Sequence, residues 1–294
     1  MLPERTNTPL QSFRIGLAQM NPHLGDVTRN IQKHLDVVAE AEAQAVDVLL
    51  FPELSLHGYF LEDLVTETAC RLDDPLLAPL IAASDRMSIL FGMVEESADQ
   101  RFYNSGVYLE AGRVRHLHRK VYLATYGMFD EGRYLAAGEH LRAFDTRFGR
   151  LGALICEDFW HPSAVSIVHA DGADLILGIS SGPGRGVSGE SQDLRSAQTW
   201  HNLNNLYARM FTSYVVYCNR VGYEDGVNFW GGSEVVGPDG TVLVRAPYFE
   251  EAFVTAEVSA EAMRRQRSLL PLLRDERLDL TYRELRRIYR ERYA

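Results

Sequence analysis

The chain has 294 residues, of which 46% are hydrophobic and 24% charged, a composition typical of a globular protein long enough to bury a large core. The formal net charge of −10 argues against a broad nucleic-acid-binding surface, which needs clustered Lys and Arg. Residues 261–294 differ, because they hold ten Arg against six acidic residues, a net +4 that leaves −14 for the first 260. We interpret this Arg-rich tail as a solvated helix or a subunit contact.

The sequence also predicts where the protein resides. No run of residues approaches the roughly 18 apolar residues of a membrane span, and the first ten residues are polar, without the apolar core of a secretory signal. Cys70, Cys156 and Cys218 are too few and too dispersed for a disulfide framework. We therefore expect a cytoplasmic protein with neither membrane nor nucleic acid as a partner.

The first predicted elements alternate strand and helix. An apolar stretch over residues 13–20 (FRIGLAQM) predicts a buried strand, and residues 28–45 show helical spacing that places Ile31, Leu35, Val38 and Ala39 on one face. A second strand, VDVLLF, ends at Phe51, directly before Pro52 and Glu53. Further strands are predicted over residues 89–94, 105–109, 114–118, 150–155, 174–180, 214–219, 233–236, 242–246 and 252–258.

The later elements complete one domain. The stretch after Gly231 is typical of a meander closed by turns such as Pro-Asp-Gly at residues 238–240. Because we find no repeat and no low-complexity linker, we expect one α/β domain, with a mixed sheet covered by helices. Residues 1–260 are assigned to this domain and residues 261–294 to a C-terminal helical extension of it, with a break at Pro271.

Potential functional side chains follow several of these strands. Glu53 follows VDVLLF, Cys156 follows GRLGALI and Ser180 ends ADLILGIS, and ligands of α/β sheets gather at the carboxyl ends of strands. A helix near Pro162 would place Cys156 between a strand end and a helix start, where a cysteine can be held as the reactive thiolate. Cys218, within an apolar strand, fits a buried structural cysteine. Cys156 is the preferred nucleophile.

Two short motifs point to other enzyme classes. Residues 178–182 read GISSG, the nucleophile elbow of α/β-hydrolases, but the last histidine, His201, follows Ser180 by only 21 residues, too few for the strands that would carry the acid and the base. Residues 184–189 read GRGVSG, a formal dinucleotide-binding motif, yet the next strand ends in Asn219 rather than an acid. We reject both and interpret the second as a flexible loop.

His116 and His118 form an H-x-H pair that a strand would project to one face, as metal ligands can be. The other histidines are scattered, and no His/Asp cluster completes a site. We interpret the pair as strand residues on a solvated face and predict neither a metal nor another cofactor.

Three separated segments carry a family resemblance. They are FPELSLHGYFLEDL (residues 51–64), HRKVYLATYGMFDEGRYLAAGE (118–139) and LICEDFW (154–160), and the likeness extends through residues 219–240. Together they resemble the nitrilase superfamily of carbon–nitrogen hydrolases, and within it the glutamine-hydrolysing domain of glutamine-dependent NAD synthetases. The resemblance covers about residues 13–260 and implies a four-layer α-β-β-α sandwich that forms dimers.

The resemblance also implies roles for individual residues. Glu53 matches the general base, Lys120 the cation that stabilises the oxyanion, Cys156 the nucleophile and Glu131 the accessory glutamate that orients the lysine. A further group matches positions that line the glutamine pocket, namely Tyr59, Tyr126, Phe129, Glu157 and Ser180.

The chain departs from the synthetases where they usually show Asn-x-Ser-x-Ser-Pro, since residues 178–183 read GISSGP, and we expect no ATP-using synthetase domain after the hydrolase domain. We therefore expect a cysteine-dependent amidohydrolase that cleaves a small polar amide through a thioester and releases ammonia or amine. The alternatives are a glutaminase subunit that supplies ammonia to a separate NAD synthetase, a nitrile hydrolase, and an interaction module without activity. A homodimer or higher homo-oligomer is expected.

Overall fold

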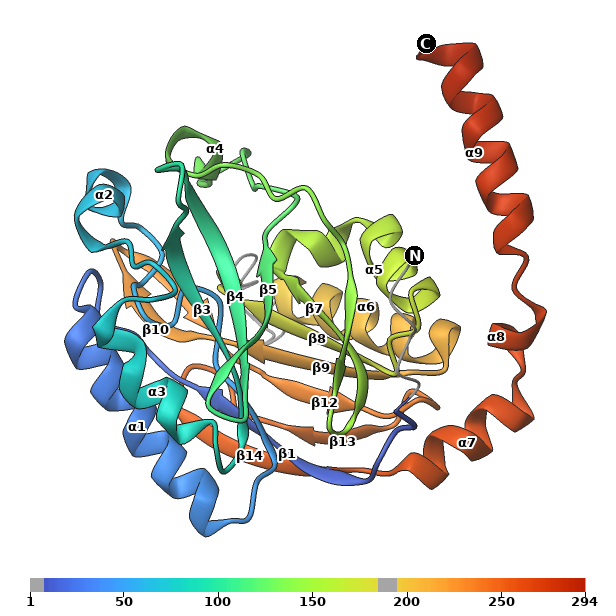
Figure 1. Ribbon diagram of the computed structural model, residues 1–294, viewed down its shortest axis with the longest axis horizontal. Coiled ribbons are helices and arrows are strands. Elements are labelled where there is room, and N and C mark those ends of the chain that lie inside the picture. Colours follow the sequence, from blue (N-terminus) through green and yellow to red (C-terminus); the bar gives the residue numbers. More distant parts are fainter. Residues whose placement is uncertain (1–7, 185–194, 294) are drawn as a thin grey trace.

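The structure, a computed structural model, describes residues 8–184 and 195–293 (Figure 1). Two six-stranded sheets form the centre of this part of the chain. The first has the order β14-β1-β2-β3-β4-β5, with bounds Ala252–Val258, Phe13–Gln19, Val48–Leu50, Ser88–Glu96, Phe102–Glu110 and Arg113–Arg119. The second has the order β13-β12-β9-β8-β7-β6, with bounds Val242–Arg245, Glu234–Val236, Tyr214–Asn219, Leu175–Ser180, Gly149–Ile155 and Ala143–Thr146.

Each sheet has three parallel strands at its centre and antiparallel strands outside them. β1, β2 and β3 run parallel, as do β7, β8 and β9. Parallel neighbours need a crossover connection, usually a helix, and α1 (Val27–Ala43), α5 (Pro162–Ala170) and α6 (Arg195–Phe211) provide three of them. The carboxyl ends of the parallel strands therefore meet at one edge of each sheet.

Alternation of side chains along the strands creates the layers. Leu17 and Leu50 of the first sheet share an apolar cluster with Ile179 and Val216 of the second, so these positions fill the space between the sheets. Leu49, one residue from Leu50, packs in a separate cluster with side chains of α1 and of α3 (Ala78–Ala83). Outward residues of β7, β8 and β9 pack with α5 and α6 in the same way. The four-layer α-β-β-α arrangement expected from the resemblance is thus confirmed.

The strands expected from the sequence are present within a few residues, with one difference in topology. β12 and β13 form the hairpin around the Pro-Asp-Gly turn, where the Gly237 amide donates to the Thr241 carbonyl (2.8 Å). The chain then leaves the meander, because β14 pairs with β1 of the other sheet, Ala256 opposite Ile15. Several short elements were not expected: β6, the hairpin of β10 (Val221–Glu224) and β11 (Val227–Trp230), α2 (Val65–Thr68), α3 and α4 (Glu131–Tyr134).

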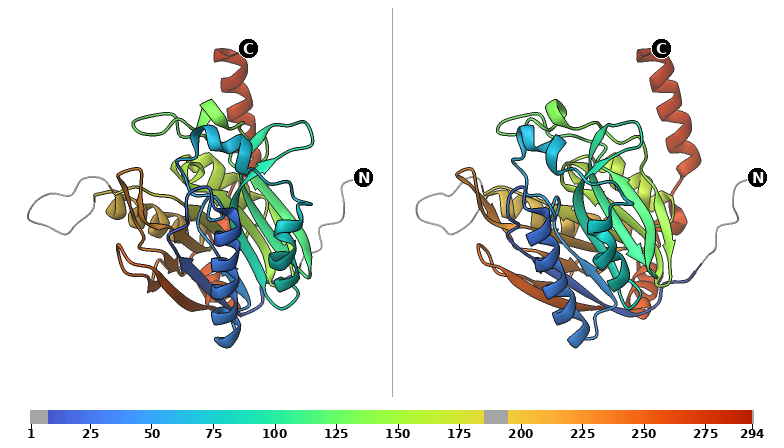
Figure 2. Two further views of the ribbon diagram at one scale, coloured as in Figure 1. Left: turned by 90° about the vertical axis from the view of Figure 1, so that its left-hand side faces the viewer. Right: turned by 60° about the vertical axis from the view of Figure 1, so that its left-hand side comes forward.

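The C-terminal residues form α7 (Ala260–Leu269), α8 (Leu272–Asp275) and α9 (Leu278–Arg292), with the expected break at Pro271. Met263 of α7 joins the core between the sheets. α9 stands away from the body of the molecule (Figures 1 and 2), and none of its residues is buried. Among the described residues, no helix combines the length and the apolar character needed to span a bilayer.

Candidate active site

The residues singled out from the sequence approach one another where strands end. Glu53 lies three residues after β2, Lys120 directly after β5, Cys156 directly after β7, and Ser180 is the last residue of β8. Gly92 of β3 permits the close approach of the Glu53 segment, since a Cβ atom there would lie 2.3 Å from the Leu54 amide nitrogen. The sheets thus bring together side chains that are far apart in the sequence.

Glu53 is fully buried and hydrogen-bonded on both carboxylate oxygens. Its Oε1 accepts from Lys120 Nζ and from Asn104 Nδ2, each at 2.8 Å, and its Oε2 accepts from the Ser181 amide at 2.6 Å. A buried carboxylate needs such partners, because the loss of hydration is otherwise uncompensated. These contacts fix the carboxylate in one orientation.

Lys120 lies between two carboxylates. Besides its contact with Glu53, its Nζ donates to Glu131 Oε1 at 2.6 Å. Burial opposes the charged ammonium, but the neighbouring Glu131 and Glu53 raise the pKa of Lys120 well above its usual value, so the side chain stays cationic.

Glu131 is held in turn by its own donors. Its Oε1 also accepts from the Tyr59 hydroxyl, and its Oε2 accepts from the Ala124 amide at 3.1 Å. Burial, together with the charge of Glu53, raises the pKa of Glu131, while Lys120 opposes this rise. Burial and the Glu131 charge raise the pKa of Tyr59 well above its usual value, so its hydroxyl remains a donor.

Cys156 occupies a strained turn. It opens a short 3-10 helix, Cys156–Trp160, with a φ of 44°, and such a left-handed conformation costs a non-glycine residue about 1–2 kcal/mol. Asp158 holds the turn, since its Oδ2 accepts from the Ile155 amide (3.0 Å) and from His118 Nε2 (2.8 Å). Its Oδ1 accepts from the amides of residues 121 and 122, at 3.1 and 3.0 Å.

The surroundings of the Cys156 sulfur favour the thiol over the thiolate. The Ser180 hydroxyl donates to Sγ at 3.3 Å, but burial and the nearby Glu53 charge raise the pKa of the Cys156 thiol well above its usual value, against the opposing effect of Lys120. Glu53 and Lys120 are therefore close enough to influence the sulfur electrostatically. A nucleophile of this kind needs a base that takes its proton during the attack.

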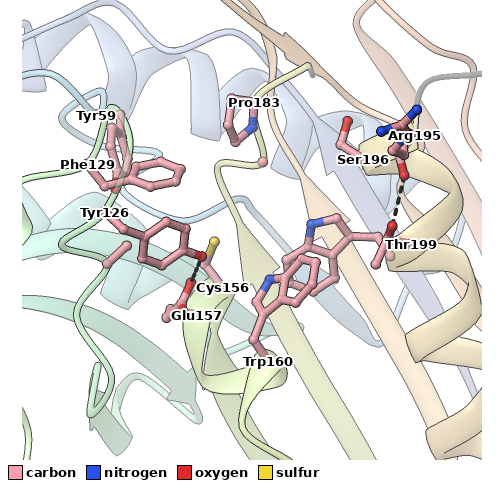
Figure 3. A pocket seen from close by; sticks show the side chains of 13 residues that line it. Tyr59, Tyr126, Phe129, Cys156, Glu157, Trp160, Pro183, Arg195, Ser196 and Thr199 are labelled. Carbon is pink, nitrogen blue, oxygen red and sulfur yellow. Dashed lines mark hydrogen bonds between the residues drawn. The ribbon is translucent and has the colours of Figure 1, made fainter. Parts of the chain in front are cut away.

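A cavity of about 400 Å³ opens beside Cys156 (Figure 3). Four of the five residues expected to line a substrate pocket do so, and the Tyr126 hydroxyl donates to Glu157 Oε2 at 2.8 Å. Ser180 is buried and contacts the sulfur instead. The described lining comprises Tyr59, Ala124, Tyr126, Phe129, Cys156, Glu157, Trp160, Gly182, Pro183, Arg195, Ser196, Thr199 and Trp200.

The histidine pair does not lie on a solvated face, so that interpretation was wrong. His118 is buried against Asp158, and His116 stacks on Phe144 with ring centroids 4.1 Å apart. The reason is that this face of β5 packs against β7 and its turn rather than facing water. No group of three or more metal-binding side chains is found in residues 8–184 and 195–293.

The structure describes one of the two short motifs rejected above, GISSG, but not most of the other, GRGVSG. Ser180 of the GISSG segment donates to Cys156, which assigns its hydroxyl to the cysteine site. Of the GRGVSG motif, residues 185–189 lie outside the described residues.

Comparison with known proteins gives a consistent family. The carbon-nitrogen hydrolase family model matches residues 14–268. The glutamine-dependent NAD(+) synthetase of Thermotoga maritima is 31% identical over 260 residues, 86% of this chain and 43% of that protein. The enzyme of the same name from Acinetobacter baylyi is 30% identical over 257 residues, 87% of this chain and 46% of that protein. The chain thus spans about half the length of these curated relatives.

Solved structures share the fold. Glutamine-dependent NAD+ synthetase from Acinetobacter baumannii, in complex with ADP, aligns with a TM-score of 0.76 and 30% identity over 86% of this chain and 47% of that one. A carbon-nitrogen hydrolase from Helicobacter pylori aligns with a TM-score of 0.79 and 23% identity over 93% of this chain and 98% of that one. The second likeness supports the fold alone.

Proposed function

Because the chain belongs to the carbon–nitrogen hydrolase family, we propose that it is a cysteine-dependent amidohydrolase that cleaves the C–N bond of a small amide through a thioester. One observation carries this proposal. A buried ammonium, Lys120, is fixed between Glu53 and Glu131 behind a cavity that reaches the Cys156 sulfur.

In the first step, Glu53 takes the thiol proton of Cys156 while the sulfur attacks the carbonyl carbon of the amide. The raised pKa of the thiol supports this role of Glu53. The carbonyl oxygen becomes an oxyanion, which the Lys120 ammonium and backbone N–H groups near Cys156 stabilise, an interaction worth about 3–4 kcal/mol at comparable sites. Glu131 keeps Lys120 charged and oriented.

In the second step, Glu53 donates the proton to the departing nitrogen, the C–N bond breaks and the acyl group remains on sulfur as a thioester. Glu53 then takes a proton from water, whose oxygen attacks the thioester carbonyl. Collapse of that intermediate releases the carboxylic acid and returns the proton to the sulfur. No metal or organic cofactor is needed for this proton balance.

A second candidate is a glutaminase subunit that supplies ammonia to a separate NAD synthetase. The observation in its favour is the 31% identity to one part of a glutamine-dependent NAD(+) synthetase about twice as long. Nitrile hydrolysis is a third candidate, because a thiolate also attacks a nitrile carbon.

Ammonia release from purified protein separates these candidates. The panel holds glutamine, asparagine, short ω-amides, N-carbamoyl compounds and nitriles. The amidase proposal requires turnover of at least one amide by the protein alone. The subunit proposal requires glutamine turnover to rise on addition of an NAD synthetase that lacks its own glutaminase domain, and nitrile turnover without amide turnover would favour the third candidate.

We also propose that the protein self-associates through α9. Leu278, Tyr282, Leu285 and Tyr289 recur on one face of α9 and are 55–63% exposed, at the 4-3-4 spacing of a helix that packs against a partner. The partner we propose is a second copy of the chain. Residues 261–294 carry a net charge of +4 and residues 1–260 a net charge of −14, so that opposite charges favour contact between the C-terminal helices of one copy and the body of the other.

The domain assignment at residue 260 and the cytoplasmic location stay predictions.

A further inference from the structure

Five of the thirteen described residues that line the cavity beside Cys156 are aromatic, and they form two groups. Phe129 lies edge-to-face with Tyr126 and with Tyr59, with ring centroids 5.7 and 6.0 Å apart. Trp160 lies edge-to-face with Trp200, at 5.5 Å. Figure 3 shows Cys156 between Tyr126 and Phe129 on one side and Trp160 on the other. Two aromatic walls therefore flank the path to the sulfur.

Two of the five ring residues are exposed. Trp160 is 41% exposed and Tyr126 51% exposed, although both line a concave site rather than an outer face. Apolar walls around a cavity are typical of a site that takes up apolar ligand surface. A flat apolar group placed there would be removed from water and would gain ring-to-ring contacts.

The buried groups behind Cys156 set the orientation of the substrate. Glu53 and Lys120 have no exposed surface, and Asn104 and Ser181 are hydrogen-bonded to the Glu53 carboxylate. The nitrogen that leaves must receive its proton from Glu53, so it faces this buried side of the sulfur. A small leaving group suits this crowded side, whereas the acyl chain points toward the aromatic walls of the cavity.

The charged groups of the described lining are few. Glu157 already accepts from the Tyr126 hydroxyl at 2.8 Å and lies 3.8 Å from His161, and Arg195 is exposed at the start of α6. A zwitterionic acyl chain held between the rings would lose hydration that the rings do not replace, because the other polar lining residues, Arg195, Ser196 and Thr199, lie on α6. An uncharged acyl chain avoids this cost.

We propose, on the basis of the amidohydrolase function above, that the preferred substrates are primary amides whose acyl chain ends in a flat apolar ring, bound between Trp160 and the rings of Tyr126 and Phe129. Trp160 is then a specificity-determining residue. It binds the distal ring and takes no part in the proton transfers at Cys156.

The test compares kcat/KM for 3-phenylpropionamide, propionamide, N-benzylpropionamide and glutamine. We expect kcat/KM for 3-phenylpropionamide to exceed that for propionamide by at least about tenfold, because the loss of apolar contacts in a matched pocket usually lowers kcat/KM by that factor. We expect N-benzylpropionamide to be a poor substrate because its ring lies on the leaving group. Trp160→Ala should lower kcat/KM for 3-phenylpropionamide by about tenfold, through KM, and leave propionamide within about threefold.

Two variants serve as controls. Trp160→Phe keeps a ring and should restore most of the preference, while Tyr223→Ala removes a ring that is 73% exposed outside the cavity lining and should change neither substrate. Equal kcat/KM for propionamide and 3-phenylpropionamide, or a preference for glutamine, would overturn the substrate proposal and leave the amidohydrolase proposal intact. Absence of ammonia from every primary amide, together with absence of benzylamine from N-benzylpropionamide, would overturn both.

Discussion

Lys120 Nζ lies 2.6 Å from Glu131 Oε1 in a site where neither side chain is exposed. Glu131→Gln keeps the shape of the side chain but removes the charge that holds Lys120. We expect kcat to fall about 10²-fold with little change in KM, because the cation acts on charge that develops in the transition state. Steady-state ammonia release measures both constants.

The matched control is Glu110→Gln, a buried glutamate that accepts from Ser88 Oγ at 3.1 Å and does not line the cavity. It should leave kcat within about twofold. A Glu131→Gln protein with the kcat of the unaltered protein would show that the second carboxylate is not needed.

Asp158 provides a second prediction, because four hydrogen bonds converge on its carboxylate beneath Cys156. In Asp158→Asn, one oxygen becomes an NH₂ group that faces other donors. We expect the free energy of unfolding to fall by about 1–3 kcal/mol, the cost of unsatisfied buried groups, and kcat to fall because the strained turn loses its anchor. Urea unfolding and ammonia release check the two effects.

Asp73→Asn is the control for this variant. Asp73 is an exposed residue in an ion pair with Arg71, and such pairs contribute about 0–1 kcal/mol. If Asp158→Asn were no more destabilising than Asp73→Asn, Asp158 would not be what holds the turn.

The central strand-end residues could be predicted from the sequence because each lies in a local motif. Glu53 and Cys156 each follow an apolar stretch that is a strand in the structure, whereas Lys120 follows the polar strand Arg113–Arg119 and was predicted from the family resemblance. The roles of Asn104 and Ser181 could not be predicted in this way. Their contacts with Glu53 join residues that are 51 and 128 positions apart, and sequence spacing does not encode such tertiary contacts. The sequence places acids directly after Cys156, but no local pattern predicts that Asp158 anchors the turn.

The histidine pair illustrates the same limit. Strand periodicity predicts that His116 and His118 share a face, but it does not predict what covers that face, and β7 covers it. The strand over residues 252–258 was predicted as a strand and its partner was not, because pairing with β1 depends on residues more than 230 positions away.

Buried histidines predict the response of stability to pH. Burial lowers the pKa of His57 from 6.5 to about 4 and that of His34 to about 3. Between these values and 6.5 the unfolded chain binds protons that the folded protein does not, so stability falls as pH falls through this range, by up to about 1.4 kcal/mol per pH unit for each group.

The free energy of unfolding in urea, measured at pH 7, 6 and 5, checks this slope. His57→Gln should be less stable at pH 7, because two hydrogen bonds of His57 are altered, but its stability should depend less on pH. An unchanged slope in both His57→Gln and His34→Gln would contradict the account.

Self-association through α9 gives a further prediction. Light scattering after size-exclusion chromatography should show at least twice the 33.2 kDa of one chain. Leu285→Glu combined with Tyr289→Glu places two charges on the apolar face and should yield a monomer, whereas Glu284→Ala, which alters another face of the helix, should not. Because no residue of α9 is buried in one chain, the thermal midpoint of the monomeric variant should be reduced only by the lost association. An unaltered protein that runs as a monomer would refute the proposal.

The most direct test of the central claim is the rate of ammonia release by Cys156→Ala on whichever amide the unaltered protein hydrolyses fastest, with Cys70→Ala as the control cysteine. We predict that Cys156→Ala releases ammonia at the rate of the protein-free solution while Cys70→Ala retains turnover. Ammonia release by Cys156→Ala at a rate near that of the unaltered protein would contradict nucleophilic attack by this sulfur.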